Sequence, residues 1–119
     1  NFIELNKLSS GQLRVESRTD GTLSFNTVLI NPALPGVPIK FALRLVDGDF
    51  AIAWDDGTNS GIFTDAGYVT PLGLDTARLF HGNGLPGFVR QIVPFTDAKS
   101  DQVLQDMVTL GYKLWKESL

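Results

Sequence analysis

Two tight turns within residues 40–64 constrain this chain more than any other feature. Asp47-Gly48 and Asp56-Gly57 each stand between runs in which apolar and polar side chains alternate. Glycine accepts the positive φ that tight hairpin turns need, so Asp-Gly between alternating runs predicts a hairpin. We therefore predict three consecutive antiparallel strands, a β-meander, over residues 40–64.

A second hairpin precedes the meander. Residues 12–18 alternate between apolar and polar side chains, Asp-Gly follows at 20–21, and residues 22–30 form the predicted return strand. Alternation with a period of two is typical of a strand with one face in water. Because Val28 and Ile30 make the far end apolar on both faces, we expect that end to lie toward the middle of the sheet.

The connecting segments carry weaker signals. Residues 31–38 contain three prolines, which lack the N–H group that a central strand needs, so we predict a loop. We predict one or two helical turns over residues 74–81, a loop to residue 87 and a strand over residues 87–95.

One long helix is predicted over residues 97–119. Its apolar residues span about 160° of the helix surface, wider than the stripe of about 100° that contact with a sheet uses. The surplus side carries Leu104, Val108 and Trp115, which we predict to form an interface with a partner. A helix sunk deeper into its own core explains the same width, and of the two interpretations the pattern favours this one.

These elements predict the α+β class: an antiparallel β-meander sheet of about five or six strands, with the C-terminal helix packed across one face. A barrel or rolled sheet closed at one end by the helix is the alternative. A length of 119 residues predicts a single α+β domain, residues 1–119.

Composition excludes several functional classes. Thirteen acidic against ten basic residues give a net charge of −3, which argues against binding nucleic acid or anionic lipid. The chain has no cysteine, so it has no disulfide or thiolate chemistry. No apolar run approaches the roughly 20 residues that span a bilayer, so we predict no membrane insertion. Because the chain starts at Asn1 rather than Met, we expect a signal peptide or expression leader to have been removed.

Catalytic motifs are missing from the sequence. His81 is the only histidine, and no Gly-x-Ser-x-Gly elbow accompanies it, so we predict no catalytic residue and no cofactor. If the loops bind a small ligand, His81, Asn83 and Arg90 are the candidate side chains. The aspartates of the meander are good turn formers, and we interpret them as such rather than as a metal site; binding of Ca²⁺ is the competing hypothesis.

We therefore predict a non-enzymatic protein-interaction module that binds a protein partner or associates with itself, with a homodimer as one form. The alternative is a small-ligand-binding domain or small enzyme that uses the loops 31–38 and 81–87.

Overall fold

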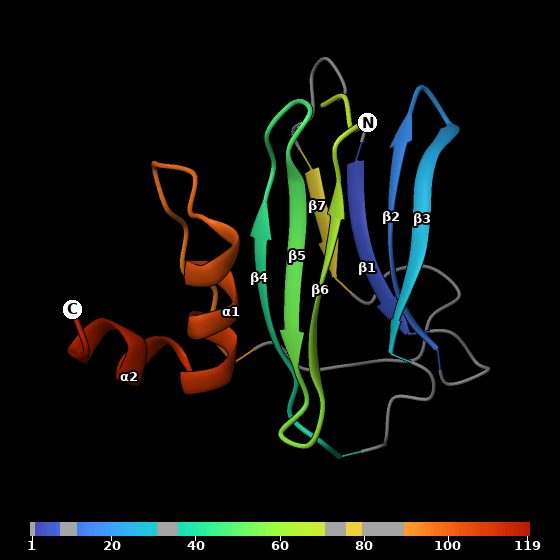
Figure 1. Ribbon diagram of the computed structural model, residues 1–119. Coiled ribbons are helices and arrows are strands. Elements are labelled where there is room, and N and C mark those ends of the chain that lie inside the picture. Colours follow the sequence, from blue (N-terminus) through green and yellow to red (C-terminus); the bar gives the residue numbers. More distant parts are fainter. Residues whose placement is uncertain (1, 8–11, 31–35, 71–75, 80–89) are drawn as a thin grey trace. The chain divides into compact units, whose positions relative to one another are not determined.

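The computed structural model describes residues 2–7, 12–30, 36–70, 76–79 and 90–119 (Figure 1). These residues contain seven strands in two sheets, followed by two C-terminal helices of which the first packs on one of the sheets. The predicted α+β class is confirmed. The single predicted sheet is replaced by a sheet of four strands and a sheet of three.

The chain divides into two compact units, each made from two separate stretches. Unit 1 takes Asn1–Pro35 and Pro71–Val93, and unit 2 takes Gly36–Thr70 and Pro94–Leu119. The two units alternate along the sequence, so neither is one continuous segment. The expectation of one folding domain stays a prediction. Each unit is described here by itself.

Unit 1 contains sheet A, with the strand order β3-β2-β1-β7. Its strands are β1 (Phe2–Lys7), β2 (Leu13–Thr19), β3 (Thr22–Ile30) and β7 (Thr76–Leu79). The hairpin β2–β3 is confirmed: Asp20 and Gly21 both have positive φ, 49° and 78°, as a two-residue hairpin turn of this hand requires. β1 pairs antiparallel with β2, whereas β7 runs parallel to β1.

Three local predictions differ from the structure. Residues 76–79 are strand β7 rather than helix, because pairing with β1 outweighs the weak helical preference of four residues. β3 lies at the edge of sheet A, not toward its middle, and Val28 is 45% exposed. Residues 90–95, the described part of the strand predicted over 87–95, form no strand.

Unit 2 contains sheet B, the predicted meander. Its strands are β4 (Lys40–Arg44), β5 (Phe50–Asp55) and β6 (Ser60–Asp65), in that order. Both neighbouring pairs are antiparallel and run without a register shift. Gly48 and Gly57 adopt φ of 70° and 89° in the two turns, which confirms the turn interpretation of both Asp-Gly pairs.

Helix α1 (Asp101–Leu110) packs on one face of sheet B, and α2 (Tyr112–Glu117) follows it (Figure 1). The hydroxyl of Ser100 accepts the N–H of Val103 at 3.3 Å and so caps the start of α1. Gly111, with φ of 83°, divides the predicted long helix in two. Neither of the described helices is long and apolar enough to cross a bilayer.

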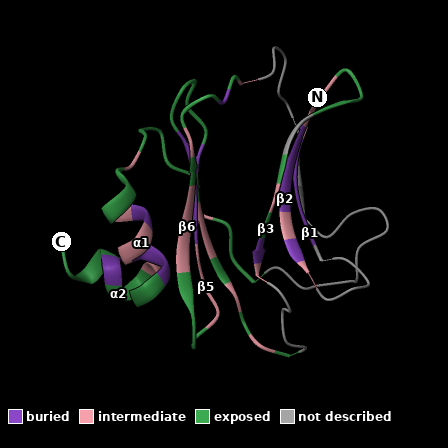
Figure 2. Cartoon of the chain, turned by 45° about the vertical axis from the view of Figure 1, so that its right-hand side comes forward, coloured by how far each residue is buried: buried purple, intermediate pink, exposed green. Residues whose placement is uncertain are grey.

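The core of unit 2 lies between β5 and the two helices. Alanines 51 and 53 give α1 a flat surface on the sheet, because their side chains project little from it. Figure 2 shows the buried positions of the helices in purple. The buried members of this core are Ala51, Ala53, Leu104, Met107, Val108 and Trp115.

Candidate functional site

The predicted ligand residues are not brought together in the described part of the chain. His81 and Asn83 lie outside the described residues, as do residues 31–35 and the whole loop 81–87. Arg90 is exposed in an irregular stretch. A small-ligand or enzymatic role for the loops 31–38 and 81–87 therefore stays a prediction.

The predicted interface residues lie in the core of unit 2. Leu104 and Val108 are buried against β5, and Trp115 is 8% exposed. The Trp115 ring meets the rings of Phe95 and Tyr112, with centroids 6.0 Å apart in both cases. These side chains therefore supply packing within unit 2, and their use as an interface stays a prediction.

Asp55, Asp56 and Asp65 accept backbone N–H groups of their own turns. Asp56 Oδ1 accepts the N–H groups of Asn59 at 2.6 Å and Thr58 at 2.9 Å. These bonds favour the ionised form, so they lower the pKa of the Asp56 carboxyl. Within the described residues, no three His, Cys, Asp or Glu side chains group closely enough to hold a metal ion. Turn formation thus accounts for these three aspartates.

Asp47 makes a longer-range bond of the same kind. Its Oδ1 accepts the N–H of Thr70 at 2.6 Å, which lowers the pKa of the Asp47 carboxyl. The bond joins the β4–β5 turn to the segment that follows β6, so it serves the fold of unit 2.

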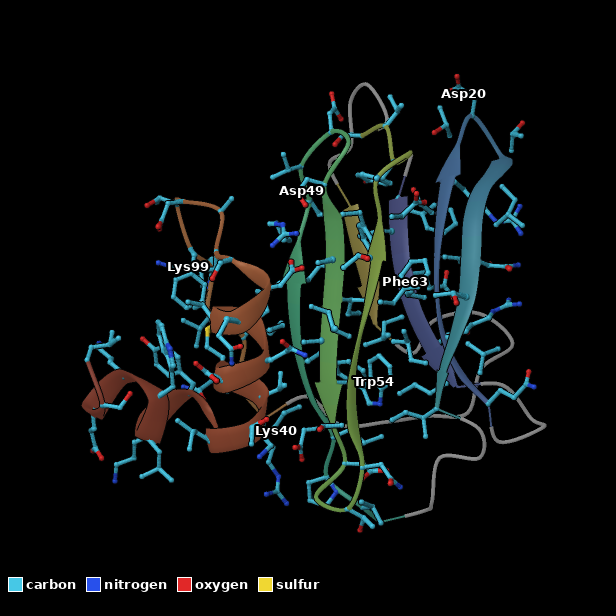
Figure 3. All side chains as sticks on the ribbon, viewed as in Figure 1. Asp20, Lys40, Asp49, Trp54, Phe63 and Lys99 are labelled. Atoms are coloured by element: carbon cyan, nitrogen blue, oxygen red, sulfur yellow. The ribbon has the colours of Figure 1, made fainter. Side chains whose placement is uncertain are left out.

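Arg44 is the buried cation of unit 2, with its side chain 6% exposed. It donates to the carbonyl oxygens of Asp49 at 2.9 Å and Lys99 at 2.8 Å. Its Nη2 also pairs with the carboxylates of Asp49 at 2.5 Å and Asp101 at 2.7 Å. Figure 3 marks Asp49 at the β4–β5 turn and Lys99 just before α1. All these bonds end on groups of unit 2, so Arg44 ties the meander to the start of α1.

Sheet A carries a charged cluster on its polar face. Glu4 and Glu16 are direct cross-strand neighbours on β1 and β2, and both are buried. Asn6 Nδ2 donates to Glu4 Oε1 at 2.7 Å, and Arg14 and Arg18 each pair with Glu16 at 3.4 Å. Two carboxylates against two guanidinium groups leave the cluster neutral. Charge is therefore balanced, as buried charges require, although Glu16 Oε2 lies 3.4 Å from Arg14 Nη2 without accepting a hydrogen bond from the described residues.

A groove of about 270 Å³ lies between α1 and the β5–β6 hairpin of unit 2. It is smaller than most small-molecule sites, which begin near 300 Å³. Five of its eight lining residues carry an amide, a carboxylate or a hydroxyl group. The lining residues are Trp54, Ser60, Gly61, Gln102, Gln105, Asp106, Val108 and Thr109.

Gly61, in the wall of this groove, faces Trp54 across the β5–β6 pair. A Cβ on Gly61 would overlap the Trp54 ring at Cη2 and Cζ2 and lie 3.1 Å from Cε2. Glycine is therefore required here for close approach, because the indole occupies the space of a side chain.

Gly61→Ala is expected to lower the free energy of unfolding by about 1–2 kcal/mol, because the indole must move. Urea denaturation followed by tryptophan fluorescence measures this loss. Trp54→Leu removes the obstructing ring atoms, so the alanine should cost much less in the double variant. Equal costs in the two backgrounds would show that the two residues are not coupled.

The edge of sheet A formed by β3 is the second candidate surface. Among the described strands, four lie at sheet edges: β3, β7, β4 and β6. The three shorter ones each contain at least one charged residue, whereas the nine residues of β3, TLSFNTVLI, contain no charge and no proline. Exposed edges without such residues are prone to pair with another strand.

Comparisons with protein-family models, curated proteins and solved structures found no match to this chain. What the two candidate surfaces can do must therefore follow from their own geometry. Sequence reasoning missed both, because an edge and a groove depend on which elements become neighbours.

Proposed function

We propose that this protein is a non-enzymatic interaction module that associates with a second copy of itself through the edge that β3 forms among the described strands of sheet A. The single observation that carries the proposal is the position and composition of β3. It is the longest described strand, it has a neighbour on one side only among the described strands, and it has no charged residue.

A second copy fits this edge because backbone ladders are self-complementary. Two β3 strands related by a two-fold axis pair antiparallel, and each contributes the same residues to a symmetric interface. No charge in the strand meets a like charge across the axis. Leu23 and Val28 are both exposed and would lose apolar surface to water on pairing.

The shape of β3 limits the strength of this association. Register shifts against β2 fall at both ends of residues 25–28, and such irregularities twist an edge away from a partner. The regular stretch between them pairs residue for residue with β2. We therefore expect a short ladder and a reversible dimer of the weak, transient class.

Val28→Lys is expected to abolish self-association, because a lysine on each copy places like charges in the ladder and removes an apolar contact. Sedimentation velocity across a series of protein concentrations measures the self-association. For the wild type, the apparent mass should rise from 13.0 kDa toward twice that value. The variant should stay at the monomer mass.

Val69→Lys is the matched control, because it makes the same change at a residue that is 70% exposed outside any strand. It should associate like the wild type, and circular dichroism should show that both variants fold. A wild type that stays monomeric at its highest soluble concentration contradicts the proposal. So does a Val28→Lys variant that still dimerises.

A further inference from the structure

The groove between α1 and the β5–β6 hairpin is lined by residues that take no part in the dimer proposed at β3. Gln102, Gln105, Asp106 and Thr109 line it from α1, and Ser60 lines it from the start of β6. All of these residues belong to unit 2. We propose that this groove binds a small, uncharged molecule rich in hydroxyl groups, of the size of a monosaccharide or cyclic polyol.

Size sets the first limit on the ligand. At about 30 Å³ for each water, a volume of 270 Å³ holds roughly nine water molecules. A compact polyol matches such a volume, whereas a nucleotide or a peptide segment would extend well beyond the groove into solvent.

Charge sets the second limit. Of the residues that the structure describes, Asp106 is the only ionisable one that lines the groove, and no described lysine or arginine lines it. Phosphate and carboxylate ligands depend on cationic partners, so they would meet a negative charge with no compensation. This argues against phosphorylated sugars and organic acids as ligands.

Hydrogen-bonding capacity favours hydroxyl groups over an amine. Glutamine side chains both donate and accept, and the Ser60 and Thr109 hydroxyls do the same. A hydroxyl of the ligand also does both, so it can use each of these groups, whereas an ammonium group only donates. The lining offers four such two-way groups against one carboxylate.

One polar pair of the lining is held in place by a hydrogen bond, and the helix that carries it is fixed by packing. Gln102 Nε2 donates to Asp106 Oδ1 at 2.8 Å along one face of α1, which orients the carboxylate. Val108 is buried in the core directly below this face and fixes α1 on the sheet. Polar groups held on a packed helix lose little freedom when a ligand binds.

Ligand-observed NMR by saturation transfer tests the inference on the full chain. The probes are D-glucose, D-galactose and myo-inositol, with glucose 6-phosphate and putrescine as the anionic and cationic comparisons. We expect at least one neutral probe to bind with a Kd of about 1 mM, which is typical of few contacts in an open site. Glucose 6-phosphate and putrescine should give no signal.

Gln105→Leu should weaken binding about five-fold or more, since it removes hydrogen bonds worth about 1 kcal/mol each. The matched control is Gln91→Leu, at an exposed glutamine outside the groove, and it should leave binding unchanged. Val28→Lys should also retain binding, so this test is independent of the proposed dimer. The inference is overturned if no neutral probe binds at a concentration 100 times the expected Kd. It is also overturned if putrescine or glucose 6-phosphate binds more tightly than the neutral probes, or if the Gln105→Leu variant binds them as well as the wild type.

Discussion

Trp115→Ala is expected to lower the free energy of unfolding by about 3–5 kcal/mol, the largest effect of any single change considered for this chain. The side chain is 8% exposed and lies in the core cluster of unit 2. Alanine would leave a cavity where the indole contacts Phe95 and Tyr112. For a small protein with a total stability of 5–15 kcal/mol, this is a large share.

Urea denaturation followed by circular dichroism at 222 nm measures the loss. Circular dichroism is used because the substitution itself removes one of the fluorescent tryptophans. Leu114→Ala is the matched control: it is the preceding residue of the same helix, and it is 58% exposed. Its cost should stay within about 0.5 kcal/mol. An unchanged stability in Trp115→Ala, together with lost self-association, would instead support the interface predicted from the sequence.

The meander was predictable because its signals are local. Asp-Gly turns require positive φ at glycine, and the alternation on either side of each turn fixes which face each side chain takes. The same reasoning located the hairpin β2–β3. In both cases the residues that form the element lie within a few positions of one another along the chain.

Elements that depend on distant pairing were not predictable in this way. β7 is four residues long and is a strand because it lies beside β1, some 70 residues away in the sequence. The order β3-β2-β1-β7 leaves β3 at the edge, although its apolar far end suggested a central position. A hydrophobic pattern shows that a strand is half-buried, but not which neighbours it has.

The C-terminal helix shows that candidate sites, too, depend on which elements become neighbours. The width of its apolar sector predicts a surplus side for a partner, and that use of the surplus side stays a prediction. In the structure, the break at Gly111 turns the helix into two segments, and Leu104, Val108 and Trp115 all pack in one core. The groove beside α1 had no sequence signal, because its polar residues come from a strand and a helix about 40 residues apart.

Arg44→Met is expected to lower the free energy of unfolding by about 2–3 kcal/mol, even though methionine fills a similar volume. Arg44 donates to two backbone carbonyl oxygens and to the Asp49 carboxylate, and it forms an ion pair with Asp101; the variant leaves all four groups without this partner. Lys99 directly precedes Ser100, the N-cap of α1, so the start of the helix should loosen first. Arg44→Lys should recover only part of the loss, because one ammonium group cannot reproduce the planar fork of the guanidinium.

The buried arginine and the exposed carboxylates of this network should respond differently to substitution. Asp49 and Asp101 are 62% and 52% exposed, so water can replace Arg44 as their partner, and Asp101→Ala should cost about 1 kcal/mol or less. Arg90→Met, at an exposed arginine, is the control for removing a positive charge and should change stability by less than about 0.5 kcal/mol. Urea denaturation of all four variants at low and high salt separates the contributions. If Arg44→Met costs no more stability than Arg90→Met, the bonds from Arg44 to the backbone do not hold the meander to α1. If the cost of Arg44→Met persists at high salt, these bonds do hold it, because salt screens exposed ion pairs but not buried hydrogen bonds.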